Sequence, residues 1–168
     1  AEGVKLDHVK AASWYLKSAE QGKAEAQYAL AQMIFFGNGV EIDRPKAIEW
    51  YLKAAEQGLV DAQYALAVNY DSGDGVEIDK AEAFRWCTKA AEQEHMMSQN
   101  NLAAFYYLGE EVAEDKAKAA FWFEKSAKQG NPQAMKNLAQ MLKEGDGIPA
   151  DRKRSDYWMK KAGLIRLT

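Results

Sequence analysis

The feature that most constrains this chain is an internal repeat of 36 residues. Tryptophan recurs at this interval five times, and aspartate and lysine keep the same interval on either side of it, with no insertion to break the register. A repeat of this length predicts a stack of small supersecondary units, because one unit alone cannot bury its apolar face. The recurring positions are Asp7, Asp43, Asp79, Asp115 and Asp151; Trp14, Trp50, Trp86, Trp122 and Trp158; and Lys17, Lys53, Lys89, Lys125 and Lys161.

The first half of each period predicts an amphipathic helix. Counted from Ala62, apolar residues stand four, five and eight positions further along the chain, which places them on one helical face. Gly73 follows the last of them and predicts the end of the helix. We refer to these helices as type A.

The second half of each period predicts another helix, which we refer to as type B. In the segment 43–58, Asp43 predicts an N-cap, Pro45 is tolerated in the first turn, and Gly58 predicts a C-cap. Alanine recurs where the helices must approach closely, and no alternating strand pattern is present, which argues against β structure. The expected buried stripe is Ala47, Trp50, Tyr51, Ala54 and Ala55.

These patterns predict an all-α solenoid of antiparallel helix-turn-helix repeats with about nine helices, forming one repeat domain over residues 1–168. The segment 1–23 is predicted to be a type B helix without its type A partner, with its helix at about Asp7 to Gln21 and its first six residues aligned with a loop. This register predicts either further repeats upstream or a mature N-terminus left by signal cleavage. The expected full repeats are 24–59, 60–95, 96–131 and 132–163, followed by a tail at 164–168 whose Leu164, Ile165 and Leu167 are predicted to act as a cap.

The recurring motif AQYxLAxxYxxGxGVxxDxxKAxxWYxKAAEQG resembles the Sel1-like repeat family, which is related to the tetratricopeptide repeats. The resemblance covers nearly the whole chain. It implies a right-handed superhelix in which type A helices line the concave face and type B helices the convex face. It also implies a role as an adaptor in assembling protein complexes, by analogy of fold. Some family members carry disulfides between helices A and B, which the single Cys87 excludes here.

Composition excludes several classes of protein. The net charge of −3 and the pI of about 5.5 give no general reason to expect nucleic acid as a partner. No run of 18 apolar residues is present, so no membrane insertion is expected. The N-terminus lacks the charged-then-apolar pattern of an uncleaved signal peptide. Composition therefore leaves the compartment open between cytoplasm and periplasm or secretion.

No catalytic or metal-binding motif stands out, so we expect no enzyme activity, no cofactor and no metal. The Gly-x-Gly pairs follow helices rather than strands, which indicates helix termination and not a phosphate cradle. The segment 71–79 resembles a calcium loop, but glycines occupy two positions where an EF-hand needs oxygen ligands. His8 and His95 have no partner at ligand spacing, and Cys87 occupies a position expected to face the core as an inert thiol.

The candidate site is the part of each repeat that varies. The family geometry places five residues of each type A helix on the concave face, and these differ strongly between repeats while the packing positions stay fixed. We name this set the variable face. Its residues are Glu25, Tyr28, Gln32, Phe35 and Phe36; Asp61, Tyr64, Val68, Asp71 and Ser72; Met97, Asn100, Ala104, Tyr107 and Leu108; and Gln133, Lys136, Gln140, Lys143 and Glu144.

The composition of the variable face favours protein binding. Aromatic residues and methionine are enriched at interfaces, and here they cluster at positions that stability does not require. The first hypothesis is therefore an adaptor that holds a peptide or protein segment in a concave groove. Lys136 and Lys143 would orient an acidic stretch of that segment. The alternative is a binding module for a small ligand, such as a cell-wall fragment, in the same groove.

Overall fold

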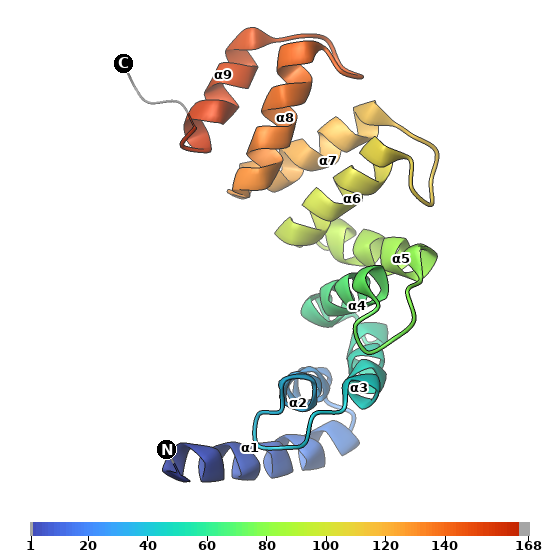
Figure 1. The fold of residues 1–168 in the computed structure, drawn as a ribbon, viewed down its shortest axis with the longest axis vertical. Coiled ribbons are helices and arrows are strands. Elements are labelled where there is room, and N and C mark those ends of the chain that lie inside the picture. Colours follow the sequence, from blue (N-terminus) through green and yellow to red (C-terminus); the bar gives the residue numbers. More distant parts are fainter. Residues whose placement is uncertain (1, 165–168) are drawn as a thin grey trace. The chain divides into compact units, whose positions relative to one another are not determined.

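The computed structural model describes residues 2–164, with side chains from Asp7 onward. It divides into two compact units, which we call unit 1 (Ala1–Lys89) and unit 2 (Ala90–Thr168), and each is described separately. Nine helices and no strands lie within residues 2–164 (Figure 1), which confirms the all-α solenoid of helical hairpins. They are α1 (Glu2–Glu20), α2 (Ala24–Phe36), α3 (Arg44–Glu56), α4 (Val60–Ser72), α5 (Lys80–Glu92), α6 (Met96–Leu108), α7 (Lys116–Lys128), α8 (Pro132–Glu144) and α9 (Arg152–Lys161).

The ends of the helices follow the repeated residues. Gly37 ends α2 in the left-handed conformation, with φ of 74°, which glycine adopts readily because it has no Cβ. The Asp43 carboxylate accepts a hydrogen bond of 3.1 Å from the backbone N–H of Lys46, and so caps α3 as predicted. Its own backbone N–H donates to the carbonyl of Ile34 at 3.2 Å, which ties the loop to the preceding type A helix.

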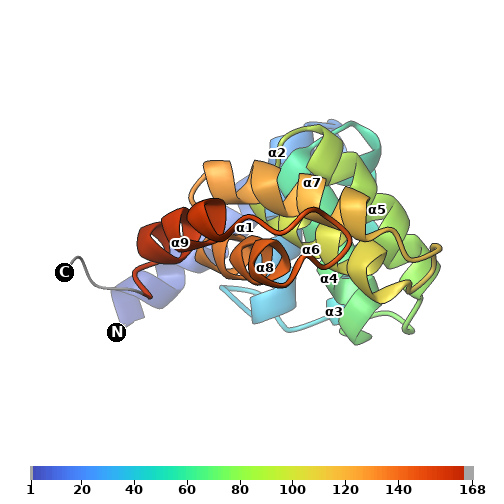
Figure 2. The same ribbon diagram turned by 90° about the horizontal axis from the view of Figure 1, so that it is seen from above.

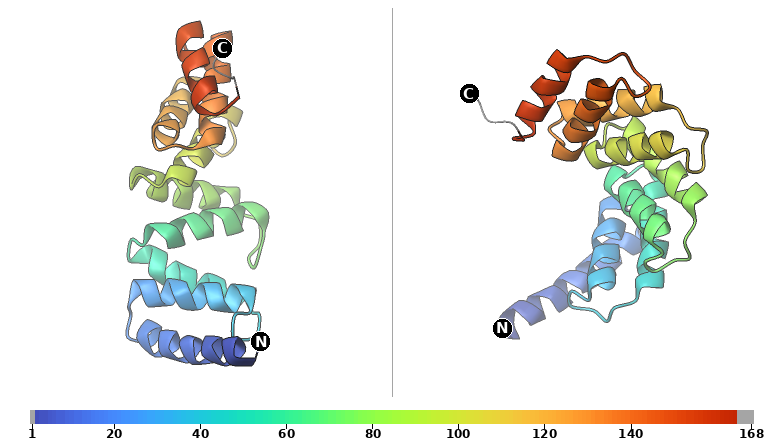
Figure 3. Two further views of the ribbon diagram at one scale, coloured as in Figure 1. Left: turned by 90° about the vertical axis from the view of Figure 1, so that its left-hand side faces the viewer. Right: turned by 45° about the horizontal axis from the view of Figure 1, so that its top comes forward.

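Unit 1 contains α1 to α4 and most of α5. In Figure 3, α1 and α2 lie side by side, joined by a short turn, and α2 packs against α3 in the same way. The core between these helices is built from small and branched residues, because alanine lets the helix backbones approach closely. Ala31, Ala54 and Leu66 are fully buried there.

Unit 2 contains the end of α5 and helices α6 to α9. Figure 2 shows α8 beside α9, and extensive contacts also join α6 with α7 and α7 with α8. The core of unit 2 is one continuous apolar cluster around Phe123 and Leu138. Leu164, at the end of the described chain, is exposed, whereas the predicted capping residues Ile165 and Leu167 lie outside the described residues.

The first helix is longer than predicted. We expected a helix at about Asp7 to Gln21, whereas α1 begins at Glu2, so the segment aligned with a loop is helical instead. In the other repeats this loop is held by a hydrogen bond from its aspartate N–H to the preceding type A helix, as Asp43 shows. Among the described residues, Asp7 has no such helix before it. The backbone groups of this segment are therefore satisfied within the helix itself.

The five tryptophans differ in burial more than their repetition suggests. Trp86 is buried as expected, with 1% of its surface exposed. Trp50 and Trp122 are only half-buried, whereas Trp158, in the last helix, is 5% exposed because the unit 2 core surrounds it. Trp14 is 69% exposed. Tryptophans at equivalent positions of the repeat therefore contribute differently to the free energy of unfolding.

A row of buried glutamines joins successive repeats, which sequence reasoning missed. The Gln99 side chain donates to the carbonyl of Ala91 at 3.3 Å, and its oxygen accepts a bond of 2.8 Å from Gln129. Gln27 repeats this pattern with Ala19 and with Gln57. Each glutamine thus links the preceding and the following type B helix. Met135 stands at the equivalent position of the last repeat and packs in the apolar cluster instead.

Replacing Glu94 by glycine is expected to stabilise the protein. Glu94 has a φ of 66°, in the left-handed region, where Gly58 and Gly130 stand in neighbouring repeats. A side chain in this conformation costs about 1 kcal/mol, which corresponds to a rise in melting temperature of roughly 2–4 °C for a chain of this size. Thermal unfolding followed by circular dichroism measures it. An unchanged or lower melting temperature would contradict the strain at Glu94.

Candidate partner-binding face

The variable face of unit 1 is partly exposed and partly tied into the fold. Tyr28 and Tyr64 are half-buried, and the Tyr28 hydroxyl accepts a hydrogen bond of 2.8 Å from Gln32. Burial, followed by the nearby Asp61 carboxylate, raises the pKa of Tyr28. Phe36 is 62% exposed, and its ring meets that of Phe35 edge-on, with the ring centres 5.0 Å apart. Glu25, Asp61, Val68, Asp71 and Ser72 are also exposed.

Phe35 was expected on the exposed variable face, but only 8% of its surface is exposed, because it packs within its own repeat. Its ring lies 6.3 Å from that of Tyr51 on α3, and the Arg44 guanidinium lies 5.3 Å from its centre. Aromatic stacking and the cation–π contact both hold it against its own repeat. Of the two adjacent phenylalanines, only Phe36 is available to a partner.

The variable face of unit 2 carries exposed apolar residues on α6 and exposed polar residues on α8. Leu108 is 60% exposed and Met97 is 40% exposed, while Asn100, Ala104 and Tyr107 are half-buried. On α8, all five members of the set are exposed. They are Gln133, Lys136, Gln140, Lys143 and Glu144.

A polar cluster fixes the α6 end of this face. The Tyr107 hydroxyl donates to one oxygen of Asp146 at 2.8 Å, and the Lys116 ammonium donates to the other at 2.7 Å. These hydrogen bonds, that of Lys116 first, lower the pKa of Asp146, and the same contact raises the pKa of Lys116. The Asp146 charge is thus neutralised locally, and the Tyr107 ring is held in a defined orientation.

Beside this cluster lies a pocket of about 250 Å³ between α6 and α8, which we call the α6–α8 pocket. Its base is apolar, and its rim carries amides and carboxylates. The volume is smaller than the range of about 300–1,000 Å³ typical of small-molecule sites. The lining residues are Ala104, Tyr107, Leu108, Phe123, Asn137, Gln140, Met141, Glu144 and Asp146.

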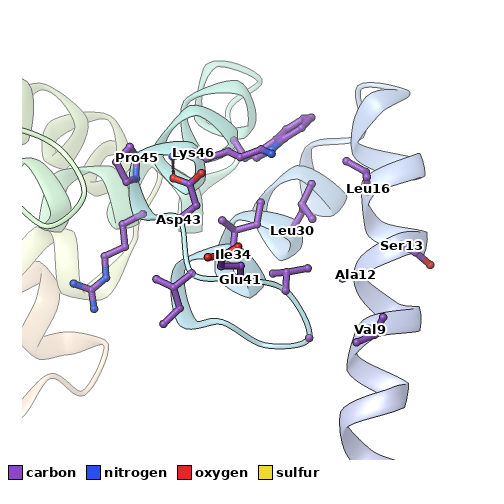
Figure 4. A pocket seen from close by; sticks show the side chains of 15 residues that line it. Val9, Ala12, Ser13, Leu16, Leu30, Ile34, Glu41, Asp43, Pro45 and Lys46 are labelled. Atoms are coloured by element: carbon purple, nitrogen blue, oxygen red, sulfur yellow. Dashed lines mark hydrogen bonds between the residues drawn. The ribbon is translucent and has the colours of Figure 1, made fainter.

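A larger cleft of about 730 Å³ lies in unit 1, away from the variable face. Figure 4 shows Val9 and Leu16 of α1 on one side, with Leu30 of α2 on the other and Lys46 at the start of α3. None of the variable-face residues lines this cleft. It has the size of a small-ligand site, and it is lined by α1, α2, the loop after α2 and the first half of α3.

Cys87 is buried under the face in unit 1, as predicted. Burial, followed by the Asp71 carboxylate, raises the pKa of its thiol from 9.0 to about 12. The thiolate is the reactive form, so the native thiol holds roughly a thousandth of the thiolate of an ordinary cysteine near neutral pH.

We therefore expect native Cys87 to react with a thiol reagent at pH 8 at least about 100-fold more slowly than the unfolded chain. Absorbance of the released chromophore, with and without denaturant, measures both rates. Fast labelling of the folded protein would show that Cys87 is accessible and ionised.

No group of three or more potential metal ligands occurs among the described residues. His95, as expected for a helix-end residue, caps α6: its Nδ1 accepts from the Ser98 N–H at 3.2 Å. Within the described part of the chain, no helix is both long and apolar enough to cross a membrane.

Comparison with known proteins identifies the repeats. The Sel1 repeat model matches five times, at residues 1–23, 24–59, 60–95, 97–131 and 132–164. A search of curated protein sequences returned no match. A protective antigen of uropathogenic Escherichia coli with an SLR fold is 35% identical, with a TM-score of 0.89, over 92% of this chain and 33% of that one.

A Sel1 repeat protein from Oxalobacter formigenes is 38% identical, with a TM-score of 0.85, over 93% of this chain and 45% of that one. This chain therefore spans less than half of either relative. Helicobacter pylori cysteine rich protein B shares the fold, with 24% identity and a TM-score of 0.58 over 73% of this chain and 87% of that one. Sel1 repeat proteins generally act as protein-interaction scaffolds and are typically non-catalytic. The chain belongs to the Sel1 repeat family.

Proposed function

We propose that this chain is a non-enzymatic adaptor that binds a segment of another protein on the variable face of its type A helices. The observation that carries the proposal is the division between fixed and variable positions. The leucines and alanines that recur in the type A helices, such as Leu66 and Leu102, are buried. The residues that differ include large apolar side chains left in solvent, such as Phe36 and Leu108.

This pattern supports recognition rather than folding. Stability depends on the buried side chains, because they fill the space between helices. An exposed phenylalanine or leucine adds nothing to that packing, but it supplies contact area when a partner covers it. The small-ligand alternative draws support from the 730 Å³ cleft of unit 1. None of the variable-face residues lines that cleft, so we favour a protein partner.

Site-specific photo-crosslinking in cells that produce the protein can test whether the partner binds the type A or the type B helices. A photoreactive phenylalanine analogue replaces Leu108 in one variant and Phe121 in the other. Phe121 is a matched control, because it is 53% exposed and apolar but lies on the type B helix α7. We expect a discrete crosslinked protein from position 108 and none from position 121.

A crosslink from position 121 alone would place recognition on the type B helices and overturn the proposal. Absence of a protein adduct at both positions, and at Phe36 in unit 1, would also count against it. In that case, binding of a small molecule in the cleft of unit 1 becomes the better account.

A further inference from the structure

We propose that unit 2 binds a short acidic segment, which inserts one large apolar side chain into the α6–α8 pocket and pairs its carboxylates with Lys136 and Lys143. This inference rests on the proposed function and gives it a ligand class. It depends on the size of the pocket, on the two lysines beside it on α8, and on the ion pair between Lys116 and Asp146 at its rim.

The pocket suits a single side chain. Its volume of about 250 Å³ is enough for one leucine, methionine or phenylalanine and too small for most drug-sized ligands. Phe123 and Met141 supply a buried apolar base, and Leu108 stands exposed at the edge, where it can close over an inserted group. Apolar anchors of this kind commonly dominate the affinity of peptide complexes.

The two lysines lie on the neighbouring stripe of α8. Residues three and four apart are neighbours on a helix surface, so Gln140, at the pocket, has Lys136 on one side and Lys143 on the other. Both lysines are exposed, and neither forms an ion pair among the described residues. A segment that runs along α8 over the pocket therefore meets two available positive charges.

Negative groups at the pocket rim do not reverse this preference. The Lys116 ammonium already neutralises Asp146, and the Tyr107 hydroxyl donates to the same carboxylate. Glu144 accepts a hydrogen bond from Gln140 and is the remaining carboxylate of the rim. The charges left for a partner on this stripe are thus two positive and one negative, which favours an acidic ligand.

The distance between Lys136 and Lys143 determines how far apart the acidic residues of the ligand should be. Seven residues along a helix correspond to about 10 Å, and an extended chain covers this distance in about three residues. The matching peptide carries one leucine between two glutamates that are about three residues apart. Its binding should weaken with salt, because exposed ion pairs are screened within about 10 Å at 0.1 M.

The test uses fluorescence anisotropy of a labelled peptide of this design, with the full chain as receptor. Exchange of the peptide leucine for alanine should weaken binding about tenfold or more. The protein variant Lys136→Gln with Lys143→Gln should weaken it several-fold at low salt. The matched control is Lys153→Gln with Lys160→Gln on α9, which removes the same charge from two exposed lysines at the same spacing.

Equal effects of the two double variants, or binding that ignores the peptide leucine, would overturn the inference. No binding of the peptide would overturn it as well. The proposed function fails separately, through the crosslinking result at Leu108 and Phe121. A partner captured at position 108 that binds equally well to the Lys136 and Lys143 double variant would keep the adaptor role and remove the acidic ligand.

Discussion

Replacement of Trp86 by alanine is expected to lower the free energy of unfolding by about 3–5 kcal/mol, the usual cost of removing a buried aromatic side chain. Trp86 is 1% exposed in α5, so the substitution leaves a cavity that its neighbours can fill only in part. The same substitution at Trp14, which is 69% exposed, should cost less than about 1 kcal/mol. Urea unfolding followed by circular dichroism measures both.

Two further variants make this comparison specific to burial. Trp158→Ala should resemble Trp86→Ala, because Trp158 is buried in the core of unit 2. Trp86→Phe should cost much less than Trp86→Ala, because phenylalanine fills most of the cavity that alanine leaves. Both variants remove the indole N–H, which is buried without a hydrogen-bond partner among the described residues. If Trp14→Ala destabilises as much as Trp86→Ala, the packing of the repeats described above is wrong.

The repeat predicts most of the fold, because the same residues return wherever two helices meet. The interval between Asp43 and Gly58 gave the bounds of α3 to within a few residues. The start of α1 could not be predicted in this way. The alignment assumes that every repeat has the same neighbours. In the later repeats the aspartate N–H donates to a preceding type A helix, whereas no such helix lies before Asp7 among the described residues.

Contacts between repeats were the other feature that sequence reasoning missed. Gln27, Gln63 and Gln99 recur at the same interval as the tryptophans, and so do the glutamines near the ends of the type B helices. The signal was present, but polar residues at helix ends are usually solvated. Only the structure shows that Gln99 is buried and joined to Gln129.

The candidate face was predicted as a set of positions, but not in its detail. Helical periodicity cannot separate Phe35 from Phe36, because both lie near the boundary between the packed and the exposed sides of α2. The difference arises from Tyr51 and Arg44, which approach from α3 and its preceding loop and cover Phe35 alone. The link from Tyr107 to Asp146, 39 residues away, likewise depends on the loop of the next repeat.

The second large effect concerns affinity. Once a partner is captured, Leu108→Ser and Phe36→Ser should each weaken binding about tenfold or more. Serine offers the partner less contact area, and the complex no longer gains from removing a large apolar side chain from water. Neither change should alter the melting temperature much, because both side chains are more than half exposed in the free protein. Phe121→Ser provides the matched change on a type B helix.

The dissociation constant of the captured partner for these variants, measured by isothermal titration calorimetry, tests the central claim most directly. The account predicts that Leu108→Ser and Phe36→Ser each raise the constant about tenfold or more, and that Phe121→Ser leaves it within about twofold of the original chain. The opposite ranking, with binding lost only in Phe121→Ser, would contradict recognition by the variable face.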